Sequence, residues 1–374
     1  MTLLIAILCG AFLAYSNGAN DNFKGVSTLF GSETTDYRKA LLWATATTFL
    51  GSIVALVLSQ GLIATFSGKG LVPNSVVELK SFSIAVVLAS AITVMIATKL
   101  GLPISTTHAI TGALVGAGWL ASSSGINFST LGSSFFAPLI MSPAIAIIFA
   151  VIAYPIFGRV NRKLGIKKDS CVCVGTEVIA IPQKARHSQA MAAYQALPVV
   201  NVGTVAGCES RFPGDILGIS GKGTLDAAHF LSAGAVSFAR GLNDTPKIAA
   251  LLLLGGAFSP AFTISVVAVS IAVGGLIHAR KVAQTMSHRI TAMDCSQGFT
   301  ANLVTSLIVI FASKWGMPVS TTHVSCGALF GIGTVTRQAH LKTILGIAAA
   351  WLATLPLAAL FGAVSFYFLK GVGF

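Results

Sequence analysis

Charged residues are scarce in this chain, and acidic residues are the scarcest. Only 9% of its 374 residues are charged, with 11 Asp and Glu against 24 Lys and Arg, whereas a soluble domain carries about 25% charged residues. The chain instead contains long apolar runs, at 40–66, 82–100, 135–157, 261–278 and 344–369. Each run reaches or approaches the roughly 20 residues that a helix needs to cross a bilayer. This composition excludes an ordinary soluble domain and predicts an integral membrane protein with several spans.

The basic residues are concentrated in connecting segments. The net charge of +13 would suit a nucleic-acid-binding protein if it covered one surface. Sixteen of the 24 Lys and Arg instead lie in four segments, at 32–39, 159–226, 279–298 and 336–342. Such a bias is typical of cytoplasmic loops. We therefore expect no nucleic-acid partner, and a multi-pass protein of the plasma membrane whose central loop is cytoplasmic.

A polar segment divides the chain into two hydrophobic halves. We expect a first transmembrane repeat over 1–158, a cytoplasmic basic loop or subdomain over 159–226, and a second transmembrane repeat over 227–374. The central segment also contains Cys171, Cys173 and Cys208. Their spacing leaves a metal site, a disulfide and free thiols open, and free thiols are the default in the cytoplasm.

The two halves repeat each other. The pattern G-x-N-D-x-x-K occurs at 18–24 and again at 241–247, and P-x-S-T-T-H occurs at 103–108 and again at 318–323. Two motifs in the same order indicate an internal duplication. If each P-x-S-T-T-H motif caps a re-entrant hairpin, each half crosses the bilayer an odd number of times. The repeats are then inverted, with the basic segments inside, which is a common plan of transporters.

Acidic residues deep in apolar segments are the first candidates for a site. Asp21 and Asp244 occupy equivalent repeat positions beside Asn20 and Asn243. A charge at membrane depth costs several kcal/mol unless it is paired or functional. Carboxylate and amide oxygens suit a small cation, so we expect Na⁺ at Asp21 and Asp244, or a proton carried on the carboxylates. The structural alternative is that each Asp merely pairs with Lys24, Lys247 or Arg240.

Hydroxyl residues form the second candidate cluster. In both hairpin motifs a proline precedes three hydroxyl residues, and proline interrupts a helix. The new helix then begins with free N–H groups and a positive dipole end, which attract an anion. The alternative is that the hydroxyls bond to carbonyls within a kinked helix. The candidate anion ligands are Ser105, Thr106, Thr107, Ser320, Thr321 and Thr322.

An enzyme is not expected from this sequence. Ser, His and Asp side chains could form a hydrolytic triad, but the chain has no nucleophile elbow. Both would-be triads are also duplicated. Catalysis usually needs one asymmetric site, whereas alternating access uses a symmetric one.

These paired motifs resemble those of the inorganic phosphate transporter (PiT) family of sodium- or proton-coupled symporters. The resemblance implies an all-α polytopic fold with two inverted-topology repeats, re-entrant helical hairpins and broken helices. It also implies cation-coupled import of phosphate without a cofactor, and a homodimer is one expectation for assembly. Asn20, Asp21, Asn243 and Asp244 match the family signature, and the six hydroxyl residues match its substrate-binding hairpin tips.

The chain also departs from the family pattern. The family usually continues Ala-Asn after Asn-Asp, whereas this chain places Lys24 and Lys247 nearby. Transport of sulfate or another oxyanion, or an anion channel, remain alternatives.

Overall fold

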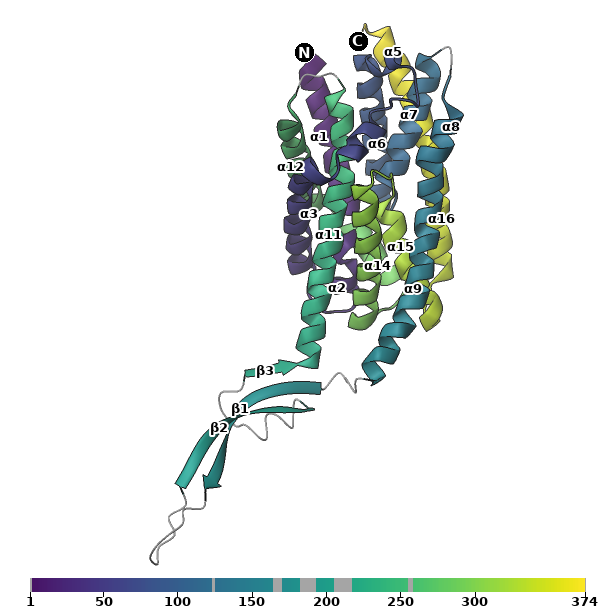
Figure 1. Ribbon diagram of the computed structural model, residues 1–374. Coiled ribbons are helices and arrows are strands. Elements are labelled where there is room, and N and C mark those ends of the chain that lie inside the picture. The colour runs from purple at the N-terminus through teal and green to yellow at the C-terminus, as the bar shows by residue number, and fades with distance from the viewer. Residues whose placement is uncertain are drawn as a thin grey trace, which may run out of the picture. The chain divides into compact units, whose positions relative to one another are not determined.

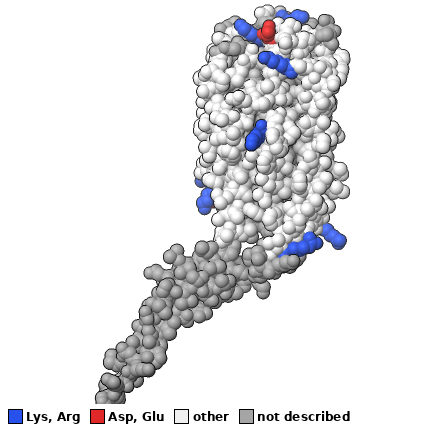
Figure 2. Space-filling model, in the orientation of Figure 1, with Lys and Arg blue, Asp and Glu red and all other residues white. Residues whose placement is uncertain are grey.

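The apolar runs fold into helices of membrane-spanning length. The computed structural model describes residues 2–122, 125–163, 170–181, 193–204, 217–254 and 258–373. Within these ranges, seven helices are long and apolar enough to cross a membrane: Thr2–Gly31, Tyr37–Leu58, Lys80–Leu100, Phe128–Val160, Pro260–His278, Cys295–Lys314 and Leu341–Gly371. On the face drawn in Figure 2, the middle of the helical bundle is mostly uncharged, and Lys and Arg lie mainly near its ends. The expectation of a multi-pass membrane protein is confirmed.

The chain forms two compact units. One comprises Met1–Tyr154 with His229–Phe374, and the other comprises Pro155–Ala228. The first unit is the helical bundle. The second contains a three-stranded antiparallel sheet of order β2-β1-β3, with β1 (Ser170–Ile181), β2 (Ala193–Thr204) and β3 (Leu217–Ser220). Cys171 and Cys173 lie on β1, whereas Cys208 falls outside the described residues.

The first half of the chain contains an interrupted helix at the first Asn-Asp pair, and a helical hairpin. α1 (Thr2–Asp21) ends at the first Asn-Asp pair, and the chain continues through a short 3-10 turn, η1 (Lys24–Val26), into α2 (Ser27–Gly31). The remaining elements are α3 (Tyr37–Leu58), α4 (Gln60–Phe66), α5 (Asn74–Val77), α6 (Lys80–Leu100), α7 (Thr106–Ala121), α8 (Phe128–Thr130), η2 (Leu131–Phe136) and α9 (Ala137–Lys163).

The second half has a similar but not identical order of elements. α11 (Gly221–Leu253) runs through the second Asn-Asp pair without ending, although Pro246 removes one backbone donor from it. The elements that follow are α12 (Pro260–His278), α13 (Arg280–Gln284), η3 (Thr285–Arg289), α14 (Cys295–Lys314), α15 (Thr321–Thr336) and α16 (Leu341–Gly371). In Figure 1, α1 descends from the end marked N, whereas α11 rises towards that end.

Two hairpins, α6–α7 and α14–α15, place the hydroxyl motifs inside the bundle. In each, a glycine with positive φ turns the chain after the first helix: Gly101 has φ 73° and Gly316 has φ 68°. A residue with a side chain adopts this conformation at a cost. Pro103 and Pro318 then prevent an immediate helix, so that the second helix begins only at the threonines. Figure 1 shows α6 and α7 in the upper part of the bundle and α14 and α15 in the lower part, with their joining turns at mid-height.

Candidate functional site

The hairpin tips begin with capped helices. Ser105 is the N-cap of α7, and its Oγ accepts a hydrogen bond from the backbone N–H of His108 at 3.1 Å. Ser320 caps α15 in the same way, accepting from His323 N–H at 3.2 Å. Both serines are buried. The helix starts that the sequence predicts after each proline are therefore present, and the serine oxygens satisfy backbone donors there.

The two tips contact each other directly. Thr322 Oγ1 of the second hairpin donates to the carbonyl of Ile104 in the first at 2.8 Å. Thr107 Oγ1 of the first hairpin lies 3.5 Å from the carbonyl of Val319 in the second. These two contacts are equivalent under the duplication. The structure therefore brings together the two threonine clusters, which are separated by more than two hundred residues in sequence.

Lys24 lies between the tips. Its ammonium contacts Asp21 Oδ1. It also donates to Thr322 Oγ1 at 2.6 Å, Asn20 Oδ1 at 2.8 Å and the carbonyl of Ile104 at 2.9 Å. The side chain is buried, with 3% of its surface exposed. A single ammonium thus connects the first Asn-Asp pair with both hairpin tips.

Lys247 has the equivalent position in the second half. Its ammonium donates to the carbonyl of Val319 at 2.7 Å and to Thr107 Oγ1 at 2.8 Å. Asp244 Oδ1 lies 3.7 Å from it. It too is buried and reaches both tips, from the opposite half of the chain.

Arg240 is a third buried cation at this site. Its guanidinium donates to Asn17 Oδ1 at 2.6 Å and to Asn22 Oδ1 at 3.0 Å. Its Nε lies 3.6 Å from Asp244 Oδ2. Arg240 and Asn17 occupy equivalent positions in the repeat, so the structure places two counterparts in direct contact.

Asn17 connects the two aspartates, a role that the motifs did not indicate. Its Nδ2 lies 2.9 Å from Asp21 Oδ2, 3.4 Å from Asp244 Oδ2 and 3.0 Å from Thr106 Oγ1. The first threonine of each tip also faces an aspartate. Thr106 Oγ1 donates to Asp21 Oδ2 at 3.2 Å, and Thr321 Oγ1 lies 3.4 Å from Asp244 Oδ2.

The motif asparagines attach the hairpins to the motif helices. Asn20 Nδ2 donates to Thr98 Oγ1 at 2.9 Å and to the carbonyl of Leu102 at 3.1 Å. Asn243 Nδ2 donates to the carbonyl of Val319 at 3.2 Å, and its Oδ1 accepts from Ser313 Oγ at 3.3 Å. These side chains hold the tips where the lysines reach them.

A histidine pair packs beside the tips. The rings of His108 and His323 lie 4.4 Å apart edge to face, and His323 lies 4.0 Å from the ring of Trp351. His323 Nδ1 is 3.3 Å from the carbonyl of Leu139. Among the described residues, His108 Nδ1 and His323 Nε2 have no hydrogen-bond partner. The pair belongs to the packing of the hairpins against each other.

The site as a whole is buried and carries excess positive charge. Three cations, Lys24, Arg240 and Lys247, face two carboxylates, Asp21 and Asp244, and none of the five is more than 3% exposed. The helix starts of α7 and α15 add the positive ends of two dipoles. Such a centre attracts an anion.

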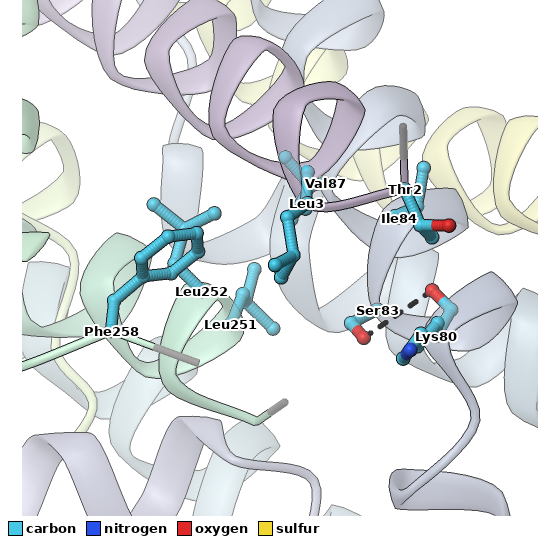
Figure 3. A pocket seen from close by; sticks show the side chains of 10 residues that line it. Thr2, Leu3, Lys80, Ser83, Ile84, Val87, Leu251, Leu252 and Phe258 are labelled. Atoms are coloured by element: carbon cyan, nitrogen blue, oxygen red, sulfur yellow. Dashed lines mark hydrogen bonds between the residues drawn. The ribbon is translucent and has the colours of Figure 1, made fainter. Parts of the chain in front are cut away.

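A separate cavity lies at another place in the bundle. Its volume is about 50 Å³, and Figure 3 shows mostly apolar side chains around it, including Leu3, Ile84, Leu252 and Phe258. None of the residues that the sequence predicts for the site lines it.

A bundle of membrane-length helices around a buried, duplicated polar centre has the architecture of a membrane transporter and not of an enzyme. The chain belongs to the phosphate transporter family, whose sequence profile matches residues 17–362. The resemblance noted from the paired motifs is therefore confirmed.

Individual relatives cover almost the whole chain. A Thermococcus kodakarensis protein, whose name gives phosphate permease as its expected activity, is 28% identical over 99% of this chain and 98% of its own. The chloroplastic inorganic phosphate transporter 2-1 of Arabidopsis thaliana is 27% identical over 94% of this chain and 70% of its own. A solved sodium-dependent phosphate transporter has the same fold, with a TM-score of 0.76 at 21% identity over 99% of both chains.

Proposed function

We propose that this protein is a secondary active transporter that imports inorganic phosphate together with a cation, Na⁺ or H⁺, by alternating access. The observation that carries the proposal is the meeting of two hairpin tips over a buried centre with more cations than carboxylates. The relatives whose names include phosphate support the choice of anion.

The tips supply hydrogen-bond donors and positive charge for a tetrahedral oxyanion. α7 and α15 direct their N-terminal ends into the site, where backbone N–H groups and the helix dipole favour negative charge. Hydroxyl donors follow at each tip, and buried ammonium groups are strong partners for phosphate oxygens. The proposed phosphate ligands are Ser105, Thr106, Thr107, Ser320, Thr321 and Thr322.

The two halves are proposed to be inverted repeats. α1 and α11 run in opposite directions (Figure 1), and the contacts of Lys24 and Lys247 exchange between the halves. Separation of one tip from the buried centre would admit phosphate from one side, and separation of the other tip would release it on the opposite side. The coupling cation is proposed to act at Asn20–Asp21 and Asn243–Asp244, the motif acids beside the tips.

The decisive experiment is uptake of radiolabelled phosphate into proteoliposomes, with Na⁺ and pH gradients varied independently. Accumulation against a phosphate gradient supports a coupled transporter, whereas equilibration without accumulation supports a channel. An excess of unlabelled phosphate should block uptake, and an equal excess of sulfate should not. No uptake under either imposed gradient contradicts the proposal.

A further inference from the structure

We propose that Lys24 and Lys247 are tethered counter-cations that replace Na⁺ at the two Asn-Asp pairs, so that phosphate transport by this protein does not require Na⁺. The inference rests on the proposed function and narrows its coupling cation. It follows from the surroundings of the two ammonium groups and from the charge of the site.

Oxygen atoms of four kinds surround the ammonium of Lys24. A carboxylate, a side-chain amide, a backbone carbonyl and a hydroxyl converge on its Nζ, contributed by Asp21, Asn20, Ile104 and Thr322. Oxygen donors of these kinds are the ligands of hard cations in proteins. The position that such a cation would take beside Asp21 is therefore filled by the ammonium.

Three of these four kinds of contact recur in the other half. Around Lys247 Nζ lie Asp244 Oδ1, the carbonyl of Val319 and Thr107 Oγ1. Each is the repeat counterpart of an atom around Lys24. A lysine that merely neutralised one nearby acid by chance would not reproduce both the carbonyl partner from the hairpin of its own half and the hydroxyl partner from the hairpin of the other half.

The charge of the site also argues against a bound Na⁺. The centre already has three cations for two carboxylates, all of them buried. A further Na⁺ would add positive charge where little water screens it, and would have to displace an ammonium that cannot leave the chain. A proton needs no coordination shell, so it is the coupling cation that remains compatible with the site.

The experiment begins with the unmodified protein. Phosphate uptake driven by a pH gradient should be the same in proteoliposomes containing Na⁺ as in those where N-methylglucamine replaces it. Addition of Na⁺ should also leave the thermal unfolding temperature of the purified protein unchanged, because a ligand raises that temperature only if it binds the folded state.

Matched substitutions of both lysines test the tethered cation itself. Lys24→Ala with Lys247→Ala removes the ammoniums and leaves space among the oxygens, so uptake without Na⁺ should fall by about tenfold or more. Na⁺ should restore this uptake and raise the unfolding temperature of the variant. Lys24→Met with Lys247→Met fills the same space and should not respond to Na⁺. Lys99→Ala, which changes an exposed lysine near the first tip, should behave as the unmodified protein.

The outcomes separate the two proposals. If the unmodified protein takes up phosphate only with Na⁺, or is thermally stabilised by Na⁺, the tethered-cation inference is wrong while phosphate transport stands. If the protein takes up no phosphate under either gradient, the proposed function itself fails. Should the alanine variants not fold, the two measurements on the unmodified protein still decide the inference.

Discussion

At the scale of single residues, substitution of the buried aspartates should cause the largest loss of phosphate uptake and of stability. Asp21 contacts the ammonium of Lys24 and accepts from Asn17 and Thr106, all within the buried site. Asp21→Asn leaves that ammonium without its carboxylate. Loss of one partner of a buried ion pair costs about 3–5 kcal/mol in the free energy of unfolding. We expect loss of phosphate uptake and a lower unfolding temperature in detergent.

An exposed aspartate provides the matched control. Asp36 is the N-cap of α3, where its side chain accepts from the backbone N–H of Lys39. Lys39 Nζ also lies 3.2 Å from Asp36 Oδ2, and the backbone and side-chain bonds to Lys39 together hold the pKa of Asp36 below its usual range. Asparagine caps a helix about as well as aspartate, so Asp36→Asn should retain uptake. Equal behaviour of Asp21→Asn and Asp36→Asn would argue against a role for the buried pair.

The tip serines separate capping from phosphate binding. Ser105→Ala removes the side-chain acceptor of the His108 N–H, and the loss of an N-cap costs about 1 kcal/mol. We expect a lower unfolding temperature, together with a higher KM for phosphate if the hydroxyl also contacts the substrate. Ser105→Asp keeps the cap but buries a carboxylate at the proposed anion site, so it should lose uptake and lower the unfolding temperature, because Ser105 is fully buried. Full uptake by Ser105→Asp would remove Ser105 from the phosphate ligands.

The sequence predicts the candidate residues of this site but not how they pair. The duplicated motifs single out Asp21, Asp244 and the threonines, and the structure brings these residues to one place. Sequence left open whether Lys24, Lys247 and Arg240 pair with the aspartates, because the direction of a long side chain depends on tertiary packing. Asn17 was missed as a site residue, since one amide in an apolar helix is a weak signal. The one sequence signal for Asn17 is that it occupies the position in the first repeat that Arg240 occupies in the second.

At the scale of elements, close helix contacts depend on glycine. A Cβ atom on Gly116 of α7 would lie 1.8 Å from the carbonyl oxygen of Ala359 on α16. Gly116→Ala should therefore force the two helices apart and lower the free energy of unfolding by about 1–3 kcal/mol. Thermal unfolding in detergent measures this effect.

Gly346, within α16 itself, is the control for this substitution. A Cβ there meets no atom within 4 Å. Gly346→Ala should leave stability unchanged or raise it by up to about 1 kcal/mol, because alanine favours helix. Similar unfolding temperatures for the two variants would show that α7 can move away from α16 at little cost.

The elements differ from expectation where local signals conflict with tertiary contacts. Proline predicts an interruption at each hydroxyl motif, and both are found. Pro246 does not end α11, because proline removes only one hydrogen bond, and side chains on both sides of it, Asn243 and Lys247, bind the second tip. The strands β1 and β2 were not predicted, since the polar composition of 159–226 indicates only a loop or subdomain.

At the scale of the whole molecule, the proposed inverted repeats place equivalent loops of the two halves on opposite sides of the membrane, and the basic residues of the loops predict which side is cytoplasmic. Lys69 and Lys342 are exposed and are expected on opposite sides of the membrane. In a chain whose own six cysteines are replaced, Lys342→Cys should react with a membrane-impermeant maleimide only in inside-out vesicles. Lys69→Cys should react only in right-side-out vesicles. Labelling of both from the same side would contradict the inverted arrangement.

The contacts between the tips have a final consequence for direction. Withdrawal of the first tip breaks its bonds to Lys24 and Lys247 at Ile104 and Thr107, and withdrawal of the second breaks the counterpart bonds at Thr322 and Val319. The bonds between the tips are lost either way. Under the proposed alternating access, the lysine bonds to the tips therefore favour neither opening over the other. The ion and phosphate gradients of the cell then decide the direction of net phosphate movement.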